Sequence, residues 1–289
     1  MRPHEVVGPV PSSDLWQLGP HRVMCGDATR MADVGRLFGP DQWRLLATSP
    51  PYLDKRDYAA TIPDWQHLAL RFMEQAMLHT LPASDCLVNL GLIHENRRVV
   101  RYWEPWLTAC EARGWPLFGW YVWDKLSGFP GDYAGRLAPA HEWLFHFQHG
   151  VTTANAWVPT RTAHVGKHKP HSSRRNPDGS MEPWHSPGRA TKVPDSVIRA
   201  PRHVARSNTN HLLHNHPAVQ AQELVACLLL TWTALGDLVY DPFGGSGQTL
   251  MTAHALGRRC YTMDIAPAYV AGMLDRWTAM TGEAPVLCT

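Results

Sequence analysis

The chain has 289 residues, of which 44% are hydrophobic and 18% charged, and its formal net charge is +2. This length allows one large α/β domain with a modest appendage, and the composition excludes a disordered chain. No apolar run reaches the roughly 18 residues of a membrane-spanning helix, and the first residues lack the apolar segment of a secretory signal. Six scattered cysteines without a Cys-x-x-Cys pair are typical of reduced, mostly buried thiols. These features predict a cytoplasmic protein without a membrane partner.

Short apolar runs alternate with helical patterns in the first half of the chain. The runs at 45–48 and 86–90 have the length of buried parallel strands. Between them, residues 66–80 carry apolar side chains at helical spacing, which predicts a crossover helix. Two aromatic-rich runs at 117–123 and 141–147, separated by Gly and Pro, are predicted to be two further strands.

This periodicity is lost in the middle of the chain and returns near its end. Residues 151–210 are rich in Pro, Gly, Ser, His and Arg, which predicts long loops. The last region predicts helices at 219–235, 247–256 and 267–280 and strands at 237–240 and 260–263. The whole pattern predicts a doubly wound, Rossmann-like, mostly parallel sheet that is interrupted by a loop-rich insertion.

The insertion is also basic. Between Val151 and Arg206, ten Lys and Arg stand against three Asp and Glu, a local charge of +7, whereas the rest of the chain carries −5. Such a segment favours a phosphate backbone as its partner. A solvated loop would carry the same charge, so charge alone leaves both interpretations open.

A glycine-rich turn at 241–249 joins a predicted strand to a predicted helix, and glycines there let the backbone approach a ligand closely. Gln248 occupies the place where a triphosphate-binding loop needs lysine, and the dinucleotide fingerprint lacks its third glycine. Asp264 lies 23 residues after Asp241, about the ~20-residue separation at which a carboxylate reaches a ribose. Two carboxylates beside a glycine turn suit a cofactor with a ribose and a cationic amino-acid tail, as in S-adenosylmethionine. A turn without a ligand is the alternative.

The strand at 45–48 runs into the loop Ser49-Pro50-Pro51-Tyr52. Two prolines fix φ and remove two N–H donors, so the loop presents carbonyl groups at the carboxyl edge of the sheet. Carbonyl acceptors suit an amine whose lone pair is delocalised into a ring, and a tyrosine ring can lie against a planar base. The loop alone would equally fit an ordinary proline-rich turn.

Thr48-Ser49-Pro50-Pro51-Tyr52, followed far downstream by Asp241-Pro242-Phe243-x-Gly245-Ser246-Gly247, resembles the DNA amino-methyltransferases. The order of the motifs is that of their β class. The resemblance extends to Cys25-Gly26-Asp27, Trp123-Asp124-Lys125, His141-Glu142-Trp143-Leu144, His216-Pro217-Ala218 with Glu223-Leu224, Leu256-Gly257-Arg258-Arg259, and Tyr269. It implies a circularly permuted class I methyltransferase fold: a catalytic half at 1–150, a target-recognition region at 151–210 and a cofactor-binding half at 211–289.

The resemblance also implies roles for single residues. The implied cofactor-binding residues are Asp27, Thr48, Asp241, Pro242, Phe243, Gly245, Gly247 and Asp264. The motif that begins at Asp241 would hold the methionine part of S-adenosylmethionine with Phe243 against it, Asp264 would bind the ribose, and Asp27 would contact the adenine. The implied catalytic residues are Ser49, Pro50, Pro51 and Tyr52. Among these, Ser49 and the Pro50 carbonyl would hold the target amino group, and Tyr52 would stack on the base.

Three positions depart from the family pattern. Gln248 stands where threonine is usual, Asp264 where glutamate is commoner, and Ala221 where proline is usual. Each of these departures bears on cofactor affinity more than on the type of reaction.

The chemistry that the resemblance implies is methylation of an exocyclic amine by direct displacement at the sulfonium methyl. Because the target atom is inaccessible inside a duplex, the base must be flipped out. Ser49 or water would take up the proton, and positioning would supply most of the acceleration. Carbon-5 methylation needs a cysteine nucleophile, which follows a proline in that family, and none of the six cysteines does. Serine at position 49 favours cytosine N4, and adenine N6 is the alternative.

The basic insertion is the predicted target-recognition region. The candidates for phosphate or guanine contacts are Arg161, Lys167, Lys169, Arg174, Arg175 and Arg189. Two histidine sets resemble zinc ligands, namely His164, His168 and His171, and His211, His214 and His216. No cysteine pair or carboxylate completes either set, so we predict no metal site.

The expected partner is double-stranded DNA. A cognate restriction endonuclease and a homodimer, which is common in the β class, are further partners that the sequence leaves open. Two other functions stay as alternatives: a non-catalytic DNA-binding protein on a methyltransferase fold, and an RNA or protein amine methyltransferase.

Overall fold

A computed structural model describes residues 10–52, 64–128, 135–160, 173–183, 189–202 and 220–288. Ten strands form one sheet: β1 (Leu15–Leu18), β2 (His21–Cys25), β3 (Trp43–Thr48), β4 (Thr80–Leu90), β7 (Leu117–Asp124), β8 (His141–His149), β13 (Val197–Arg199), β14 (Leu238–Asp241), β15 (Arg259–Asp264) and β16 (Val286–Cys288). Three short ladders pair β5 (Ile93–Glu95) with β6 (Arg98–Val100), β9 (Val158–Pro159) with β12 (Thr191–Lys192), and β10 (Ser173–Arg175) with β11 (Met181–Pro183). The helices are α1 (Met31–Phe38), α2 (Trp65–Met77), α3 (Glu104–Ala112), α4 (Gln222–Trp232), α5 (Gln248–Ala255) and α6 (Pro267–Thr281).

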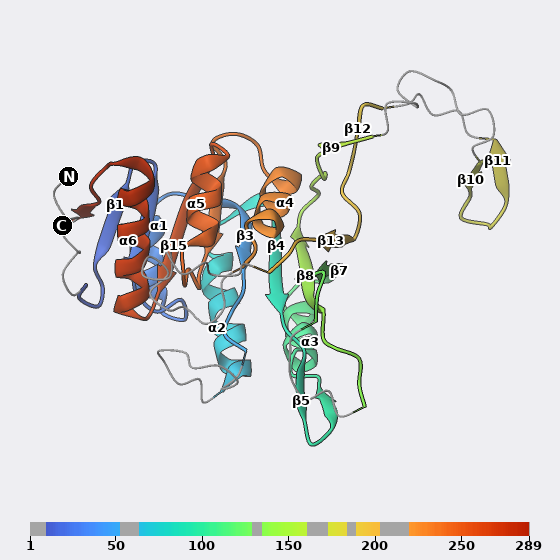
Figure 1. Cartoon of the computed structure of the whole chain (residues 1–289), viewed down its shortest axis with the longest axis horizontal. Coiled ribbons are helices and arrows are strands. Elements are labelled where there is room, and N and C mark those ends of the chain that lie inside the picture. The colour runs from blue at the N-terminus through green and yellow to red at the C-terminus, as the bar shows by residue number, and fades with distance from the viewer. Residues whose placement is uncertain are drawn as a thin grey trace.

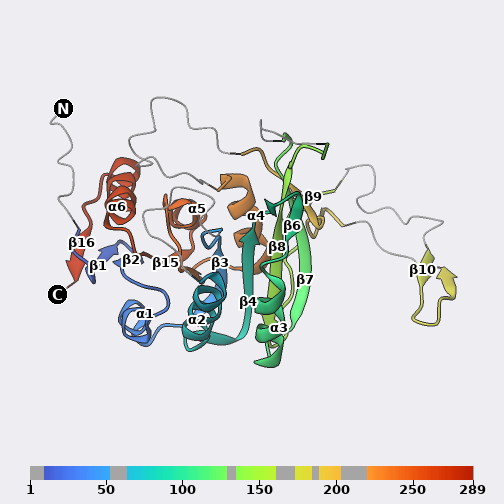
Figure 2. The same ribbon diagram turned by 90° about the horizontal axis from the view of Figure 1, so that it is seen from below.

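The sheet forms the middle of three layers. Its strand order is β13-β7-β8-β4-β3-β14-β15-β2-β1-β16. Helices α4, α5 and α6 cover one face and α1, α2 and α3 cover the other (Figures 1 and 2). The predicted doubly wound α/β fold is therefore confirmed. The circular permutation and the basic insertion stay predictions.

The five central strands β4, β3, β14, β15 and β2 all run parallel to their neighbours. Their carboxyl ends therefore reach one edge of the sheet, which we call the carboxyl edge. β8 is antiparallel to both β4 and β7, so it starts at the carboxyl edge where they end. Ligands of open α/β sheets bind outside this edge.

Each face of the sheet has its own hydrophobic core. The face under α1, α2 and α3 packs through a cluster that includes Phe38, Phe72 and Trp106. The face under α4, α5 and α6 packs through a second cluster that includes Leu228 and Trp277. Because the central strands are buried on both sides, they read as continuous apolar runs in the sequence.

The burial of the cysteines and the length and polarity of the helices agree with what the composition predicts. Cys25, Cys86, Cys110, Cys227 and Cys260 are buried free thiols, and Cys288 is partly buried, so the predicted burial is confirmed. Among the described residues, every helix is too short or too polar to cross a lipid bilayer.

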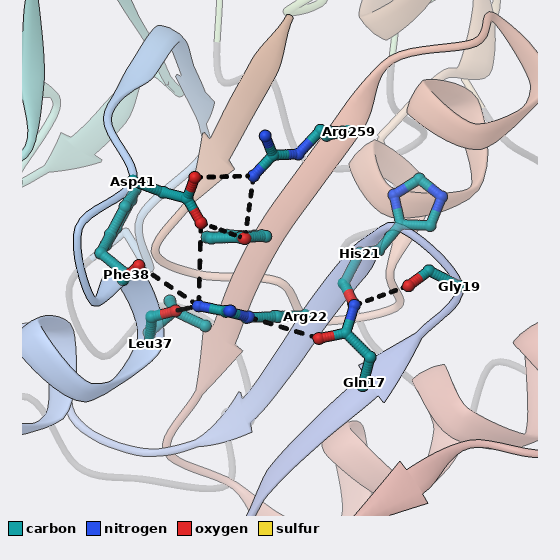
Figure 3. A network of polar contacts seen from close by, with 9 residues as sticks. Gln17, Gly19, His21, Arg22, Leu37, Phe38, Asp41 and Arg259 are labelled. Carbon is teal, nitrogen blue, oxygen red and sulfur yellow. Dashed lines mark hydrogen bonds and ion pairs between the residues drawn. The ribbon is translucent and has the colours of Figure 1, made fainter. Parts of the chain in front are cut away.

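At the opposite edge of the sheet, a polar network fastens the segment before β3 to its neighbours (Figure 3). Asp41 lies 3.1 Å from the Arg259 guanidinium and accepts a hydrogen bond of 2.6 Å from the Tyr261 hydroxyl. Burial alone would raise the pKa of Asp41, but the hydrogen bonds from Tyr261 and Arg259 lower it on balance. Arg22 donates to two carbonyl groups at the end of α1, at 2.9 and 3.2 Å. The network thus holds α1 and the start of β3 against β2 and β15.

His21 is fully buried at the start of β2. Its Nδ1 accepts a hydrogen bond of 3.0 Å from the Cys260 amide, and its Nε2 lies 3.1 Å from His254 Nδ1. Burial lowers the pKa of His21 from 6.5 to about 4, and the neighbouring His254 and Arg259 add to the shift. The folded protein therefore holds His21 neutral at pH values where the unfolded chain protonates it.

This shift predicts a loss of stability in mild acid. Below pH 6.5 His21 is protonated in the unfolded chain, whereas in the folded protein it stays neutral down to about pH 4. The free energy of unfolding should therefore fall across that window, by about 3 kcal/mol in total. Urea unfolding between pH 7 and 4.5 measures the loss, and a His21→Gln variant, which cannot titrate, should show a shallower decline. Equal slopes for the two proteins would contradict the assignment.

Candidate active site at the carboxyl edge of the sheet

The proline loop and the glycine turn start from adjacent strands. β3 and β14 pair in parallel, with Tyr240 opposite Leu46. At their ends, the Thr48 hydroxyl donates a hydrogen bond of 2.7 Å to Asp241 Oδ1, and both residues are buried. This contact joins positions 193 residues apart in the sequence. It confirms that folding brings the two motifs together at one edge.

The glycine turn is shaped by Asp241 and by its own backbone. The Asp241 carboxylate also accepts from the Phe243 amide at 3.2 Å, and burial raises its pKa. Gly247 caps α5 with φ 73°, and a Cβ there would lie 2.8 Å from Met273 Cγ, so this position requires glycine. Pro242 is buried, and Phe243 packs edge-to-face against Phe72 of α2 at 5.1 Å.

Asp264 ends β15 beside this turn. Its Oδ2 accepts from the Gly245 amide and its Oδ1 from the Ala266 amide, both at 2.9 Å. Each oxygen keeps a further lone pair, so the carboxylate can accept two more hydrogen bonds. Burial raises the pKa of Asp264 to about 6. Asp264 can therefore act as a double acceptor for neighbouring hydroxyl groups.

Asp27 lies just beyond β2, at the same edge. β2 pairs with β15, with Cys25 opposite Asp264. Asp27 Oδ1 accepts from the amide and the hydroxyl of Thr29, at 2.8 and 2.7 Å, and the Asp27 amide donates to Asp33. The predicted cofactor residues thus follow one another along the edge, from Thr48 through Asp241 and Asp264 to Asp27.

Sequence reasoning missed Arg276, which supports the glycine turn from α6. Its guanidinium donates to the Ser246 carbonyl and to Gln248 Oε1, the second contact at 3.4 Å. Burial lowers the pKa of Arg276. Gln248, the departure from the family's threonine, thereby connects the turn to α6. Arg276 belongs to no motif, so the sequence carries no signal for this contact.

The proline loop is fixed by one of its carbonyl groups. Trp65, the first residue of α2, donates from its indole to the Pro51 carbonyl at 3.0 Å. Within the described residues, the Pro50 carbonyl accepts no hydrogen bond. Ser49 is partly exposed, whereas Tyr52 is buried, with only 6% of its surface exposed. Ser49 is therefore the residue of this loop whose polar side chain is partly exposed, whereas Pro50 is buried.

The Tyr52 hydroxyl lies among polar side chains from its own loop, from β4 and from β8. It is 2.7 Å from Ser49 Oγ, 3.0 Å from Glu142 Oε2 and 3.4 Å from Asn89 Oδ1. Glu142 in turn forms a buried ion pair with Lys125, whose Nζ lies 2.5 Å from Glu142 Oε1. The sequence marked Lys125 and Glu142 only as parts of the family resemblance, and the structure places both beside the catalytic loop.

Residues 43–275 match the family model described as DNA methylase, which covers N6 and N4 methyltransferases. The chain belongs to the DNA methylase family. It is 24% identical over 233 residues to the orphan methyltransferase M.BamHII of Bacillus amyloliquefaciens, with 78% of this chain and 84% of that one covered. It is 26% identical over 270 residues to the type II methyltransferase M.XycI of Xanthomonas campestris pv. cyanopsidis, with 81% and 80% covered.

Solved structures show the same fold. The PvuII DNA methyltransferase, named as cytosine-N4-specific, superposes with a TM-score of 0.61 and 18% identity over 87% of this chain and 84% of that one. The M1.HpyAVI–SAM complex superposes with a TM-score of 0.59 and 14% identity over 88% and 97%. This DNA methylase therefore has the class I methyltransferase fold, and it is an amino-methyltransferase of DNA with S-adenosylmethionine as its methyl donor.

The residues at the carboxyl edge fit this donor. Asp264 offers two acceptor positions of the kind that a ribose diol needs. The turn at 242–247 contains no Lys or Arg that would pair with a phosphate, and it opens onto the amino terminus of α5. Asp241 and Asp264 supply negative charge for a cationic ligand. S-adenosylmethionine has a ribose, a sulfonium and an amino-acid tail, and it carries no phosphate.

The structure describes only part of the predicted DNA-contacting set. Arg174 and Arg175 lie exposed in β10, and Arg189 is exposed before β12. Arg161, Lys167 and Lys169 lie outside the described residues. The β10–β11 hairpin lies apart from the sheet in both views (Figures 1 and 2). DNA contacts by these six residues stay a prediction.

Both histidine sets considered for zinc also lie outside the described residues. These sets are His164, His168 and His171, and His211, His214 and His216. In the ranges that the structure describes, no group of three His, Cys, Asp or Glu side chains is arranged to hold a metal ion.

Gly91, just after β4, lies against the ring of Tyr52. A Cβ at this position would lie 2.9 Å from Tyr52 Cε2, so Gly91→Ala should displace the ring. We expect methyl transfer to DNA to slow by roughly ten- to hundredfold, because displacements of about 1 Å at a reacting group cost rates of this order. Gly35→Ala in α1, where a Cβ meets nothing within 4 Å, is the matched control. Equal transfer rates for the two variants would show that the position of the ring is unimportant.

Proposed function

We propose that this DNA methylase transfers the methyl group of S-adenosylmethionine to the exocyclic N4 of cytosine in a specific duplex sequence, after the base has flipped out. The observation that carries the proposal is the contact between Thr48 and Asp241 at 2.7 Å. It joins the loop that would hold the amine to the turn that would hold the methyl donor. An in-line transfer requires these two groups side by side.

Each site residue takes one task in this proposal. Ser49 and the Pro50 carbonyl accept the two hydrogens of the target amine, which exposes the nitrogen lone pair. The Tyr52 ring lies against the base. On the donor side, Asp264 binds the ribose, Asp27 lies toward the adenine, and the turn from Asp241 to Gly247 holds the amino-acid tail. The donor supplies an electrophilic methyl group, and the residues of the protein hold the target amine and the donor in place.

Two observations support cytosine over adenine. The first residue of the proline motif is Ser49 rather than aspartate, and in the family serine favours cytosine N4. The PvuII enzyme, which shares the fold, is named as cytosine-N4-specific. Adenine N6 is the alternative for the same site, because both targets are exocyclic amines conjugated to a ring.

The basic segment supports duplex DNA as substrate. The exposed guanidinium groups of Arg174, Arg175 and Arg189 suit phosphate contacts, and such contacts make binding depend on salt. A cognate endonuclease and a homodimer stay predictions of the sequence.

Transfer of a tritiated methyl group tests the proposal. The protein is incubated with labelled S-adenosylmethionine and unmethylated duplex DNA, RNA or a mixture of proteins. We expect label in the duplex alone. A protein that binds the donor and labels none of the three would be a non-catalytic binding protein, and label in RNA or protein would assign another substrate class.

A further inference from the structure

A continuous chain of polar side chains leads from the catalytic loop into the sheet. Ser49 Oγ, the Tyr52 hydroxyl, the Glu142 carboxylate and Lys125 Nζ follow one another at 2.7, 3.0 and 2.5 Å. The side chains of Glu142 and Lys125 have only 5% and 7% of their surface exposed. The four residues come from three segments: Ser49 and Tyr52 from the loop after β3, Lys125 from just after β7, and Glu142 from the start of β8.

The chemistry of these groups fixes the direction of each hydrogen bond. A carboxylate paired with an ammonium group can only accept, so Glu142 accepts from Tyr52. The Asn89 amide nitrogen donates to the Trp143 carbonyl at 3.0 Å, so Asn89 turns its oxygen toward Tyr52 and is a second acceptor. The Tyr52 hydroxyl has one hydrogen, and it donates this hydrogen to Glu142 and Asn89. Ser49 must therefore donate to Tyr52, which leaves the lone pairs of Ser49 Oγ for the target amine.

We propose that the Lys125–Glu142 ion pair sets the direction of the Ser49 hydroxyl through Tyr52, and that the proton of the methylated amine leaves along this chain. The inference rests on the proposed function, because it names the proton acceptor of that reaction. Without the ion pair, the Ser49 hydroxyl could turn and donate to the nitrogen lone pair that must attack. Glu142 touches neither the base nor the methyl group, so it is a positioning residue.

The proton transfers balance. The nitrogen–carbon bond forms as the sulfur–carbon bond breaks, and the nitrogen becomes cationic. Its proton passes to Ser49 Oγ, the serine proton passes to the Tyr52 oxygen, and the tyrosine proton passes to Glu142 Oε2. The base is left neutral and Glu142 is left protonated. Glu142 returns its proton to water after the DNA leaves.

Tyr52→Phe is the sharpest test, because it removes the hydroxyl, keeps the ring and leaves the ion pair intact. We expect the single-turnover rate of methyl transfer to fall roughly ten- to hundredfold, the lower range for a positioned proton acceptor. Two binding measurements should change less than about twofold, since the ring stays in place. These are the affinity for S-adenosylmethionine and the fluorescence of 2-aminopurine at the target position.

Tyr121→Phe is the matched control. Its hydroxyl lies 3.0 Å from His146 Nδ1, and His146 Nε2 lies 2.9 Å from Asp85, so it belongs to a similar network in the same sheet. Among the described residues, the side chains of that network make no hydrogen bond to the catalytic loop, and this variant should transfer methyl groups at the parental rate. If Tyr52→Phe matched it in rate, the inference would be wrong. The proposed function is tested separately, by identifying the methylated nucleoside that the parent protein makes. The ratio of the Tyr52→Phe rate to the Tyr121→Phe rate tests the inference whether the target amine is cytosine N4 or adenine N6.

A double-mutant cycle of Tyr52→Phe with Glu142→Gln tests the hydrogen bond between these two residues without any measurement of activity. Urea unfolding of the parent, the two single variants and the double variant gives the coupling between the two residues. We expect the two losses of stability to be less than additive. Additive losses would show that the hydrogen bond is absent in solution and would overturn the inference. If Glu142→Gln alone fails to fold, the transfer rate of Tyr52→Phe against that of Tyr121→Phe decides the inference.

Discussion

Replacing Asp241 by alanine is expected to slow methyl transfer by about a hundredfold and to destabilise the fold by about 3 kcal/mol. The carboxylate accepts hydrogen bonds from the Thr48 hydroxyl, the Phe243 amide and the Thr249 hydroxyl. The substitution leaves these donors without an acceptor in a buried place, which costs about 1–3 kcal/mol for a single group. It also releases the proline loop from the glycine turn, so that the amine and the methyl donor lose their alignment.

Asp237→Ala is the matched control for this change. Asp237 lies four residues earlier in the chain, at the other end of β14, and accepts from the Ala234 amide at 2.8 Å in an exposed turn. It should lose a little stability and keep its rate of transfer. Urea unfolding and single-turnover rates measure both effects. If Asp241→Ala retained a rate within tenfold of the Asp237→Ala rate, the contact with Thr48 could not be what aligns the site.

Replacing Asp264 by asparagine is expected to weaken the binding of S-adenosylmethionine by about a hundredfold. The carboxylate offers charge-assisted hydrogen bonds, each of which contributes about 1.5–3 kcal/mol, and tenfold in affinity corresponds to about 1.4 kcal/mol. Asparagine has one acceptor oxygen, and its NH2 group would face either the Gly245 amide or the Ala266 amide, which both donate to the carboxylate. The substitution should therefore both weaken the hydrogen bonds that hold the turn and remove an acceptor for the ribose.

The same residue should make the affinity depend on pH. Burial raises the pKa of Asp264 to about 6, neighbouring Asp241 adds to the shift, and the Ala266 and Gly245 amides oppose it. Above that pH the carboxylate is ionised and accepts at both oxygens. As the pH falls from 7.5 to 5, protonation removes one acceptor and the negative charge, so the dissociation constant should rise.

Calorimetric titration of S-adenosylmethionine at several pH values measures this effect. The parent should lose affinity through pH 6, and Asp264→Asn should bind weakly with little change across the range. Asp178→Asn, in the exposed turn between β10 and β11, should behave like the parent. A parent whose affinity is constant from pH 7.5 to 5 would place the donor away from Asp264.

The central strands were predictable because burial on both faces makes them continuous apolar runs. The runs at 45–48, 86–90, 237–240 and 260–263 correspond to β3, β4, β14 and β15. β4 nevertheless begins at Thr80, six residues before the predicted strand. The prediction missed this part because Ser84 and Asp85 are polar, although both are fully buried. Ser84 contacts Thr80, and Asp85 Oδ1 contacts His146, which lies 61 residues further along the chain, and no local pattern shows such pairing.

The flanking elements gave weaker signals. We made no prediction for the segments that form β1, β2, α1 and α3, because these elements are short and only partly apolar. The structure places β2 against β15, so the beginning of the chain contributes to the cofactor side of the edge. The resemblance at Cys25-Gly26-Asp27 implied a cofactor role for this segment, but it could not give the pairing of β2 with β15, because strand order depends on contacts between distant segments.

The site divides in the same way. The positions of Ser49, Asp241 and Asp264 follow from motifs at strand ends, since parallel strands end at one edge. The polar contacts of Glu142 and Arg276 do not follow, because their partners come from other segments of the chain. Such contacts become visible only after the strands are assembled.

Nucleoside mass spectrometry of DNA methylated by this protein tests the central claim most directly. Unmethylated duplex DNA is incubated with the protein and S-adenosylmethionine that carries a deuterated methyl group, and is then digested to nucleosides. We expect the heavy methyl group in N4-methylcytosine. Heavy N6-methyladenine in its place, or no heavy nucleoside at all from a protein that binds the donor, would contradict the account.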